Sequence, residues 1–196
     1  MPRPSAPARR TAPPQQVRII GGMWKRTPLP VADRPGLRPT PDRVRETLFN
    51  WLGQDLEGWH CVDAFAGTGA LGLEAASRGA ADVLLVEAEG ELVDRIRAIV
   101  RKLDAQQVRV QRGNALGVLA ALPAASVDLV FLDPPFEADL FDKALAVART
   151  AVRPEGFVYL EAPSAWQGEA LQRHGLELVR HTKAGAVHGH LLRRAA

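Results

Sequence analysis

The sequence predicts an α/β protein: a doubly wound, mostly parallel sheet of seven strands, with helices on both faces and a C-terminal antiparallel hairpin. From residue 60 onward, short β-rich runs alternate with helical patterns, which is typical of βαβ units and a parallel sheet. Two alternating runs, 176–182 and 188–194, then follow each other without a long helix, which indicates the hairpin. The length of 196 residues fits one such domain.

The five parallel strands are placed by apolar and β-branched residues. They are predicted at 60–65, 82–87, 107–111, 127–132 and 156–161. Helices are expected in the gaps, most clearly over about 89–103, where apolar side chains recur at helical spacing. This apolar row comprises Leu92, Ile96, Ile99, Val100 and Leu103, while Arg95, Arg97 and Arg101 point mostly away from it.

Two segments precede the predicted domain of residues 40–196. Five of the fifteen prolines fall within residues 1–16, so we expect a disordered basic tail there. Residues 17–39, with short apolar runs around two glycines, are predicted to form a basic arm or hairpin. A helix is then expected to begin at Thr40 as its N-cap, with Pro41 in the first turn. Its apolar face comprises Val44, Leu48, Trp51 and Leu52.

The net charge of +3 conceals an uneven distribution along the chain. Residues 1–45 hold ten Lys and Arg against two Asp and Glu, or +8, which leaves −5 for residues 46–196. Such a basic segment is typical of contact with a phosphate backbone. No apolar run is long enough for a membrane span or a secretory signal, so we expect a cytoplasmic protein with no membrane partner. The single cysteine, Cys61, is predicted to be a buried thiol.

A glycine-rich loop follows the first parallel strand and opens a helix, so its backbone can approach a nucleotide-like ligand closely. Gly67, Gly69 and Gly72 fit the dinucleotide pattern G-x-G-x-x-G, and Glu87 ends the next strand as an acid for a ribose. In a dehydrogenase the loop holds pyrophosphate, which Asp63 at the strand end would repel. S-adenosylmethionine has no phosphate, and its amino group favours a carboxylate. The loop therefore favours this cofactor, with a dehydrogenase as the alternative.

Asp133-Pro134-Pro135-Phe136 follows the fourth parallel strand. Because strand carboxyl ends in open α/β sheets line the ligand crevice, we expect Asp133 to face the ligand of the glycine loop. The prolines stiffen the turn and remove two N–H donors, which leaves the Asp133 carboxylate and the Pro134 carbonyl as acceptors. Two acceptors beside an exocyclic base amine favour a pyramidal nitrogen that can attack a methyl group, and Phe136 would stack on the base.

Taken together, these segments resemble a known family. The runs DAFAGTGALGLEAASRGA and FLDPPF are similar to class I methyltransferases, which have a Rossmann-like fold. With RIIGGMWKRTPLP and LRPTPDRVRETLFNWL before them, residues 17–193 closely resemble the RsmD-type 16S rRNA guanine-N2 methyltransferases. The resemblance implies methyl transfer from S-adenosylmethionine to a guanine N2 in 16S rRNA. The substrate would be the small ribosomal subunit or an assembly intermediate.

The resemblance also implies roles for single residues. The methionine part of S-adenosylmethionine would be surrounded by Asp63, Phe65, Gly67 and Gly69. Glu87 would hold the ribose hydroxyls, and Asn114 and Ala115 would read the adenine, although many relatives have aspartate at the Asn114 position. The catalytic motif corresponds to Asp133, Pro134, Pro135 and Phe136.

Basic residues of the arm and of the helix after it are the predicted RNA contacts, namely Arg18, Lys25, Arg26, Arg38 and Arg43. Two other functions stay open: methylation of an adenine or cytosine amine in DNA, and RNA binding without catalysis, which the intact Asp133 motif disfavours. No metal is expected. His188 and His190 point to one face of a predicted strand, but no third ligand is near in sequence, so we predict a solvated hairpin there.

Overall fold

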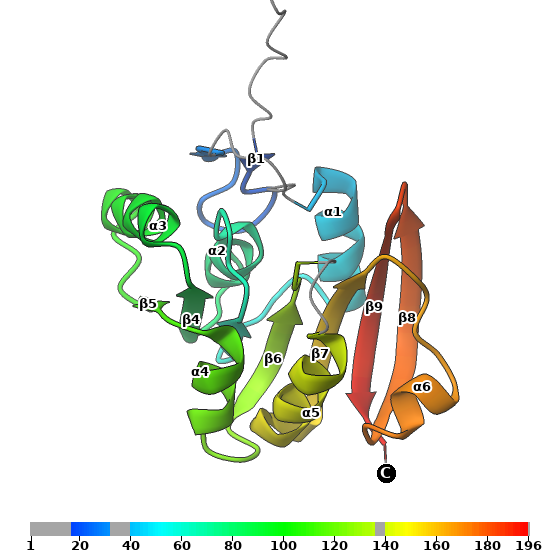
Figure 1. Ribbon diagram of the computed structural model, residues 1–196. Helices are drawn as coiled ribbons and strands as arrows, with labels where there is room; N and C mark the ends of the chain where they lie inside the picture. Colours follow the sequence, from blue (N-terminus) through cyan, green and yellow to red (C-terminus); the bar gives the residue numbers. More distant parts are fainter. Residues whose placement is uncertain (1–16, 32–39, 136–139, 196) are drawn as a thin grey trace, which may run out of the picture.

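The computed structural model describes residues 17–31, 40–135 and 140–195. The predicted tail, Arg38 and Phe136 lie outside these ranges. The centre of the molecule is a seven-stranded sheet in the order β5-β4-β3-β6-β7-β9-β8 (Figure 1). Its strands are β3 (His60–Asp63), β4 (Asp82–Glu87), β5 (Val108–Arg112), β6 (Val127–Leu132), β7 (Val152–Ala162), β8 (Leu176–Ala184) and β9 (Val187–Arg194). The predicted sheet of seven strands is confirmed.

Strands β3 to β7 are parallel, and only β9 runs against its neighbours, between β7 and β8. From β3 the chain continues outward to β4 and β5, then returns to the other side of β3 as β6. The strand order therefore reverses between β3 and β6, and open α/β sheets hold their ligands at the carboxyl ends of the strands beside such a reversal.

Strand β7 begins at Val152, four residues before its predicted start at 156. Val152 pairs with Val127, and the register then shifts so that Leu129 pairs with Phe157. The extra residues 152–155 contain a proline and two charged residues, which interrupt the apolar pattern of a buried strand. The carboxyl end of β7 is unaffected, so the edge that carries the candidate site keeps its predicted position.

Helices cover both faces of the sheet. One core contains apolar side chains of α1 (Asp42–Trp51), α2 (Ala70–Ser77) and α3 (Gly90–Lys102), and the other those of α4 (Ala115–Ala121), α5 (Phe141–Ala151) and α6 (Glu169–Gln172). Phe131 and Tyr159 face the first core, while their neighbours Val130 and Leu160 face the second, as alternation along a strand requires. In α3 the predicted apolar row faces the core, and the three arginines are exposed.

Helix α1 begins one residue later than predicted, with Pro41 at the N-cap position and Asp42 as its first residue. The predicted N-cap, Thr40, makes no capping bond. Its buried side chain instead forms a hydrogen bond with Glu161 on β7. The prediction of Thr40 as the N-cap was therefore wrong. The local sequence pattern suggested a hydrogen bond from the helix backbone to the Thr40 hydroxyl, but this hydroxyl instead binds the carboxylate of Glu161 on a distant strand.

Residues 17–31 form the predicted hairpin, with β1 (Val17–Arg18) antiparallel to β2 (Pro28–Leu29). The loop between them packs on the carboxyl-terminal part of α2. Gly22 has φ 72°, and a Cβ there would clash with the carbonyl of Ser77, so only glycine allows this approach. The Ser77 hydroxyl donates to the Gly21 carbonyl and accepts from the Trp24 N–H. We call residues 17–31 the docked arm.

A buried carboxylate on α2 anchors the docked arm. Both Glu74 oxygens accept backbone N–H groups of the arm, from Ile20 and Gly21, each at 2.7 Å. Glu74 also pairs with Arg45 of α1 at 3.3 Å and with Arg78 at 2.9 Å. Glu74 and Arg45 are fully buried. Glu74 therefore links the arm, α1 and α2. Without its carboxylate, buried N–H groups of these partners would lose their hydrogen-bond acceptor, which is costly in free energy.

Two smaller expectations can be compared with the structure. Cys61 is buried at 2% exposure, as predicted, and burial raises the pKa of its thiol. None of the helices in the described ranges combines the length and the apolar character that a membrane span requires.

Candidate active site

Three acidic residues meet at the carboxyl edge of the sheet. Asp63 ends β3, Glu161 lies one residue before the end of β7, and Asp133 directly follows β6. Asp133 continues the register in which Leu132 pairs with Leu160, which places it beside Glu161. Burial raises the pKa of Asp133, and the charges of Glu161 and Asp63 raise it further. Burial also raises the pKa of Asp63, with a contribution from the charges of Glu87 and Glu161.

The glycine loop joins Asp63 to the start of α2. Gly69 has φ 77° and occupies the N-cap of the helix, and Gly67 has φ 53°. The Gly72 N–H donates to Oδ2 of Asp63 at 3.0 Å. A Cβ at Gly72 would clash with Leu85 and press on Asp63, so the first turn of the helix reaches the strand only with glycine. The loop backbone is thereby fixed next to a buried carboxylate.

Glu87 ends β4 next to this loop, as the sequence predicts. Its two carboxylate oxygens accept the N–H groups of Gly67, at 2.8 Å, and of Glu89, at 2.9 Å. A carboxylate oxygen has a second lone pair, so each still has an acceptor position for a ligand hydroxyl. Glu87 is half-buried, which leaves those positions accessible.

Asn114 and Ala115, the residues expected to read adenine, lie where β5 passes into α4. The Asn114 side chain caps the helix, because its Oδ1 accepts the Gly117 N–H at 3.0 Å. Ala115 is buried in the first turn. The helix cap holds the Asn114 amide in one orientation, and the side chain remains exposed. Phe65, expected near the methionine part, is partly buried in the glycine loop.

Asp133, Pro134 and Pro135 lie at the end of β6, whereas Phe136 falls outside the described residues. Asp133 is partly buried and Pro134 is buried. Burial raises the pKa of Asp133 well above its usual range, and the charges of Glu161 and Asp63 raise it further. Within the described residues, no hydrogen bond to the Asp133 carboxylate is present, so it is available as an acceptor.

Glu161 was not predicted as a site residue. It is buried at 3% exposure, and the Tyr159 hydroxyl donates to it at 3.0 Å. Burial raises its pKa, while hydrogen bonds from Thr40 and Tyr159 and the charge of Arg45 lower it. A signal was present in the sequence, because Glu161 ends the fifth predicted strand just as Glu87 ends the second, and Asp133 directly follows the fourth.

The electrostatic character of this edge follows from these contacts. Among the described residues, Arg45 is the cation that acts on Glu161, and no basic side chain acts on Asp63 or Asp133. Buried carboxylates without a cation favour a positively charged ligand, because such a ligand stabilises their ionised forms. The edge is therefore suited to a cation that also carries hydrogen-bond donors.

The predicted RNA contacts differ in their surroundings. Lys25, Arg26 and Arg43 are exposed, and in the part of the chain that the structure describes none of them pairs with a carboxylate. Arg18 is exposed but pairs with Asp42 at 3.1 Å. Arg45, counted within the basic segment, is buried against Glu74 and contributes no surface charge.

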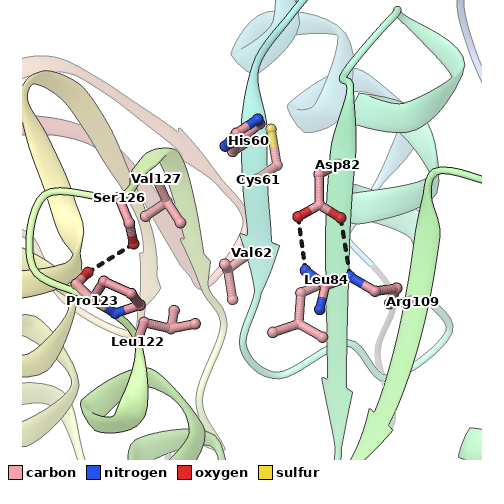
Figure 2. Close-up of a pocket in the computed structure, with 10 residues that line it drawn as sticks. All are labelled: His60, Cys61, Val62, Asp82, Leu84, Arg109, Leu122, Pro123, Ser126 and Val127. Carbon is pink, nitrogen blue, oxygen red and sulfur yellow. Dashed lines mark hydrogen bonds and ion pairs between the residues drawn. The ribbon is translucent and has the colours of Figure 1, made fainter.

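A separate cavity of about 190 Å³ lies at the opposite edge of the sheet (Figure 2). It is lined by residues at the amino ends of β3, β4 and β6, and the Asp82–Arg109 ion pair closes one side at 2.7 Å. Ligands of open α/β sheets bind at the carboxyl ends of the strands. The cavity is therefore not part of the site that the acidic residues form.

A seven-stranded sheet with one antiparallel strand, a glycine loop after its first parallel strand and acidic strand ends defines the class I methyltransferases. A family model described as Conserved hypothetical protein 95 matches residues 17–193. The chain is 43% identical over 149 residues to ribosomal RNA small subunit methyltransferase D of Escherichia coli strain K12, and the match covers 75% of each chain. The chain belongs to the family of ribosomal RNA small subunit methyltransferase D, or RsmD.

Solved structures agree with this assignment. A putative methyltransferase from Escherichia coli superposes with a TM-score of 0.79 and 39% identity, over 93% of this chain and 99% of that one. A putative methylase from Haemophilus influenzae gives a TM-score of 0.77 and 30% identity, over 93% of this chain and all of that one. The predicted fold class is confirmed over nearly the whole length of both relatives.

Proposed function

We propose that this chain transfers a methyl group from S-adenosylmethionine to the exocyclic N2 amine of a guanine in 16S rRNA. The observation that carries the proposal is the position of Asp133 and Pro134, whose acceptors follow β6 beside the carboxylates of Asp63 and Glu161. Methylation of a DNA amine would use the same acceptors. The docked arm and the family membership of residues 17–193 support RNA as the substrate.

The residues at the carboxyl edge fit S-adenosylmethionine in two respects. Gly67 and Gly69 adopt positive φ, which lets the loop turn tightly between β3 and α2, and Gly72 lets the first turn of α2 approach Asp63. Asp63 and Asp133 have no cationic partner among the described residues, and this ligand carries both a sulfonium and an amino group. Asp63, Phe65, Gly67 and Gly69 would hold the methionine part, Glu87 the ribose hydroxyls, and Asn114 and Ala115 the adenine.

The mechanism rests mainly on positioning. When bound, S-adenosylmethionine supplies an electrophilic methyl group on a positively charged sulfur. The Asp133 carboxylate and the Pro134 carbonyl accept hydrogen bonds from the guanine amine and orient its lone pair, and Phe136 stacks on the base. The two prolines hold these acceptors in place. Alignment of this kind contributes about 7–11 kcal/mol when the reacting atoms are held in line. No metal is required for this step.

The docked arm is positioned to bind the RNA around the target. Figure 1 shows it beyond α2, on the side toward which the β4 and β6 arrows point. Lys25 and Arg26 are exposed in the last part of its loop, shortly before β2 begins. Sequence-specific recognition of RNA usually targets unpaired bases, so we expect a guanine in a loop that rotates into the site. The substrate would be the small subunit or an assembly intermediate.

Transfer of tritiated methyl groups tests the activity and its substrate directly. Naked 16S rRNA, small subunits and duplex DNA are compared with the same enzyme and S-adenosylmethionine. We expect label in RNA, with N2-methylguanine recovered after digestion. Label in DNA alone would favour the DNA alternative, and no label in any substrate would favour a binding module without catalysis.

The affinity for S-adenosylmethionine is expected to fall as the pH drops below 7. Burial raises the pKa of Asp63 to about 7, so the carboxyl group becomes protonated in that range. A positively charged ligand favours the ionised form, and its α-amino group, with a usual pKa of about 7.7–8.0, is mostly protonated below pH 7. The dissociation constant should rise toward about tenfold per pH unit below 7. Calorimetry between pH 5.5 and 7.5 measures this.

Asp63→Asn is the control for this pH dependence. The amide has no proton to gain in this range, so the variant should bind more weakly but with a flatter pH profile. Equal affinity of the unaltered protein at pH 5.5 and 7.5 would show that Asp63 does not hold the cation.

Removal of the two exposed cations Lys25 and Arg26 of the docked arm should weaken RNA binding and reduce its salt dependence. Each phosphate contact contributes roughly 0.7 to the slope of log K against log salt for single strands, so Lys25→Gln with Arg26→Asn should lower the slope by about 1.4. Asparagine is chosen because Arg26 has φ 72°. Filter binding at several salt concentrations gives the slope.

A matched control neutralises two arginines at the opposite edge of the sheet, with Arg109→Gln and Arg153→Gln. The net charge changes equally, but these arginines pair with Asp82 and Asp128, far along the strands from the carboxyl edge. An equal loss of slope in both double variants would mean that net charge, rather than the arm, determines RNA affinity.

A further inference from the structure

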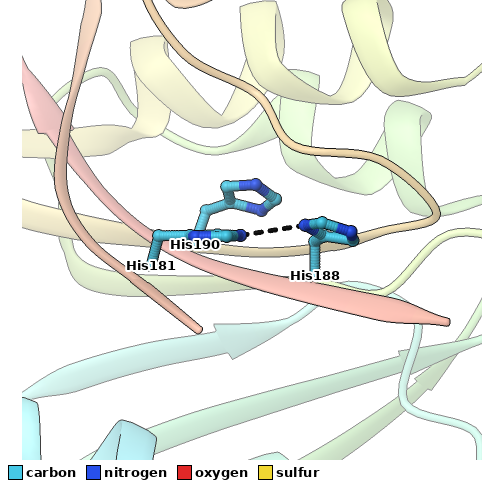
Figure 3. A group of neighbouring side chains, drawn as sticks. All are labelled: His181, His188 and His190. Atoms are coloured by element: carbon cyan, nitrogen blue, oxygen red, sulfur yellow. Dashed lines mark hydrogen bonds between the residues drawn. The ribbon is translucent and has the colours of Figure 1, made fainter. Parts of the chain in front are cut away.

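Three histidines gather on one face of the C-terminal hairpin (Figure 3). His188 and His190 are two residues apart on β9 and therefore lie on the same face of the strand. His181 of β8 is the direct neighbour of His190 in the antiparallel pairing. One ring nitrogen from each lies within 4.8 Å of the other two, and Nε2 of His181 is 2.9 Å from Nδ1 of His188. The sequence pattern indicated no third ligand near His188 and His190, because the antiparallel register that supplies His181 is not a local pattern.

The three side chains differ in exposure and in partners. His181 is exposed and His188 is half-buried, so the cluster opens to solvent on one side. His190 is fully buried, and its Nε2 accepts the Trp166 N–H at 3.0 Å. Its Nδ1 lies 3.2 Å from the Leu160 carbonyl oxygen, so this nitrogen carries the proton and donates. The buried member of the cluster, His190, is therefore oriented by its hydrogen bond to β7, and the two other histidines are accessible to solvent.

We propose that His181, His188 and His190 form a binding site for a late first-row divalent transition ion, such as Zn²⁺. Imidazole nitrogens suit zinc, copper, iron and nickel, and three histidines with one open position are an established ligand set for Zn²⁺. The 2.9 Å between the nitrogens of His181 and His188 needs to open only slightly, because ligand atoms about 2.0–2.1 Å from a tetrahedral ion stand about 3.3 Å apart.

The contacts of His190 favour the form of the imidazole ring that binds a metal ion. His190 accepts a hydrogen bond at Nε2 and donates one from Nδ1, which is the pattern of a neutral ring. A neutral ring offers its lone pair without first losing a proton. The bond from His190 Nδ1 to the Leu160 carbonyl is also the second contact that metal-bound histidines usually make.

Metal binding has one specific structural consequence. The ion takes the Nε2 lone pair of His190, so the Trp166 N–H must leave that atom. Trp166 also contacts Phe141 and His174 through its ring, and it belongs to the loop between β7 and α6. Occupation of the site is therefore coupled to a change around Trp166. The proposal is independent of the proposed methyl transfer, since the hairpin histidines face the core opposite to Asp133.

The test uses the full chain without an affinity tag and with CoCl₂ as the probe. We expect one Co²⁺ per chain, with the visible absorption of a four-coordinate ion, competed by ZnCl₂. His181→Gln and His188→Gln should each weaken binding at least tenfold. His60→Gln is the matched control, because it removes an exposed histidine at the other edge of the sheet. Thermal unfolding of each variant shows that the fold is retained.

Tryptophan emission supplies a second measurement. Zn²⁺ should change the emission of the unaltered protein, and the change should disappear in Trp166→Phe while the other three tryptophans remain. Several results would overturn the proposal. These are no saturable binding below about 100 μM, binding by His181→Gln and His188→Gln as tight as that of the unaltered protein, one ion shared between two chains, or ion binding that leaves Trp166 emission unchanged.

Discussion

Asp133→Ala is expected to abolish methyl transfer while the fold and cofactor binding are largely retained. The Asp133 carboxylate follows β6 and has no hydrogen-bond partner among the described residues, so its removal leaves few buried groups unpaired. Its interaction with the amine strengthens as the nitrogen becomes pyramidal and positive, and such an interaction acts on kcat rather than on KM alone. A preorganised group of this kind contributes roughly a hundredfold to a thousandfold in rate.

Single-turnover rates with saturating RNA and S-adenosylmethionine measure this effect. Asp133→Asn should be less severe, because an amide oxygen still accepts from the amine but stabilises the developing charge less. Asp128→Ala is the matched control. It removes the same side chain from the opposite end of β6, where Asp128 accepts the His60 N–H and pairs with Arg153. Near-normal turnover by Asp133→Ala would exclude the proposed mechanism.

Glu74→Ala is expected to cause the largest loss of stability. The substitution leaves the buried Arg45 guanidinium with Asp42 as its remaining carboxylate partner and removes the acceptor of the Ile20 and Gly21 N–H groups. Removal of one partner from a buried ion pair typically costs about 3–5 kcal/mol, because the other charge stays buried without compensation. The burial that lowers the pKa of Arg45 indicates the same cost, which Glu74 and Asp42 now offset.

Chemical denaturation of the variant gives the change in the free energy of unfolding. Glu177→Ala is the control, because its exposed pair with Arg193 is of a kind that contributes at most about 1 kcal/mol. Glu74→Gln should fall between the two, since its amide oxygen can still accept from the arm. Equal stability of Glu74→Ala and Glu177→Ala would show that the docked arm and Arg45 depend little on Glu74.

The elements of the sheet could be predicted from sequence because their signals are local. Alternation of β-rich runs and helical patterns located β3 to β7, and the acidic residues at the strand ends indicated which edge of the sheet holds the site. The signal failed where a side chain contacts a distant partner. Thr40 has the pattern of an N-cap and Arg45 that of a surface cation, and only the tertiary arrangement shows their buried contacts with Glu161 and Glu74.

The difference between local signals and distant contacts also explains why the histidine cluster and the role of Glu161 could not be predicted from the sequence. Spacing of two along a strand placed His188 and His190 on one face, but the pairing of His181 with His190 depends on hairpin register, which sequence alone specifies weakly. Glu161 carried the signal that identified Asp63 and Glu87. No motif surrounds Glu161, so its position at the predicted end of a strand does not by itself mark it as a site residue, and β7 continues one residue further to Ala162.

Helix α2 lies between the proposed cofactor site at one end and the docked arm at the other. Its first turn follows the glycine loop, and its last turn carries Glu74 and Ser77, which hold the arm. Eight residues at 1.5 Å each make the helix a rigid spacer of about 12 Å. A single inserted residue would turn one end by about 100° relative to the other. The distance from the proposed cofactor site to the proposed RNA contact is thus set by the length of one fully buried helix.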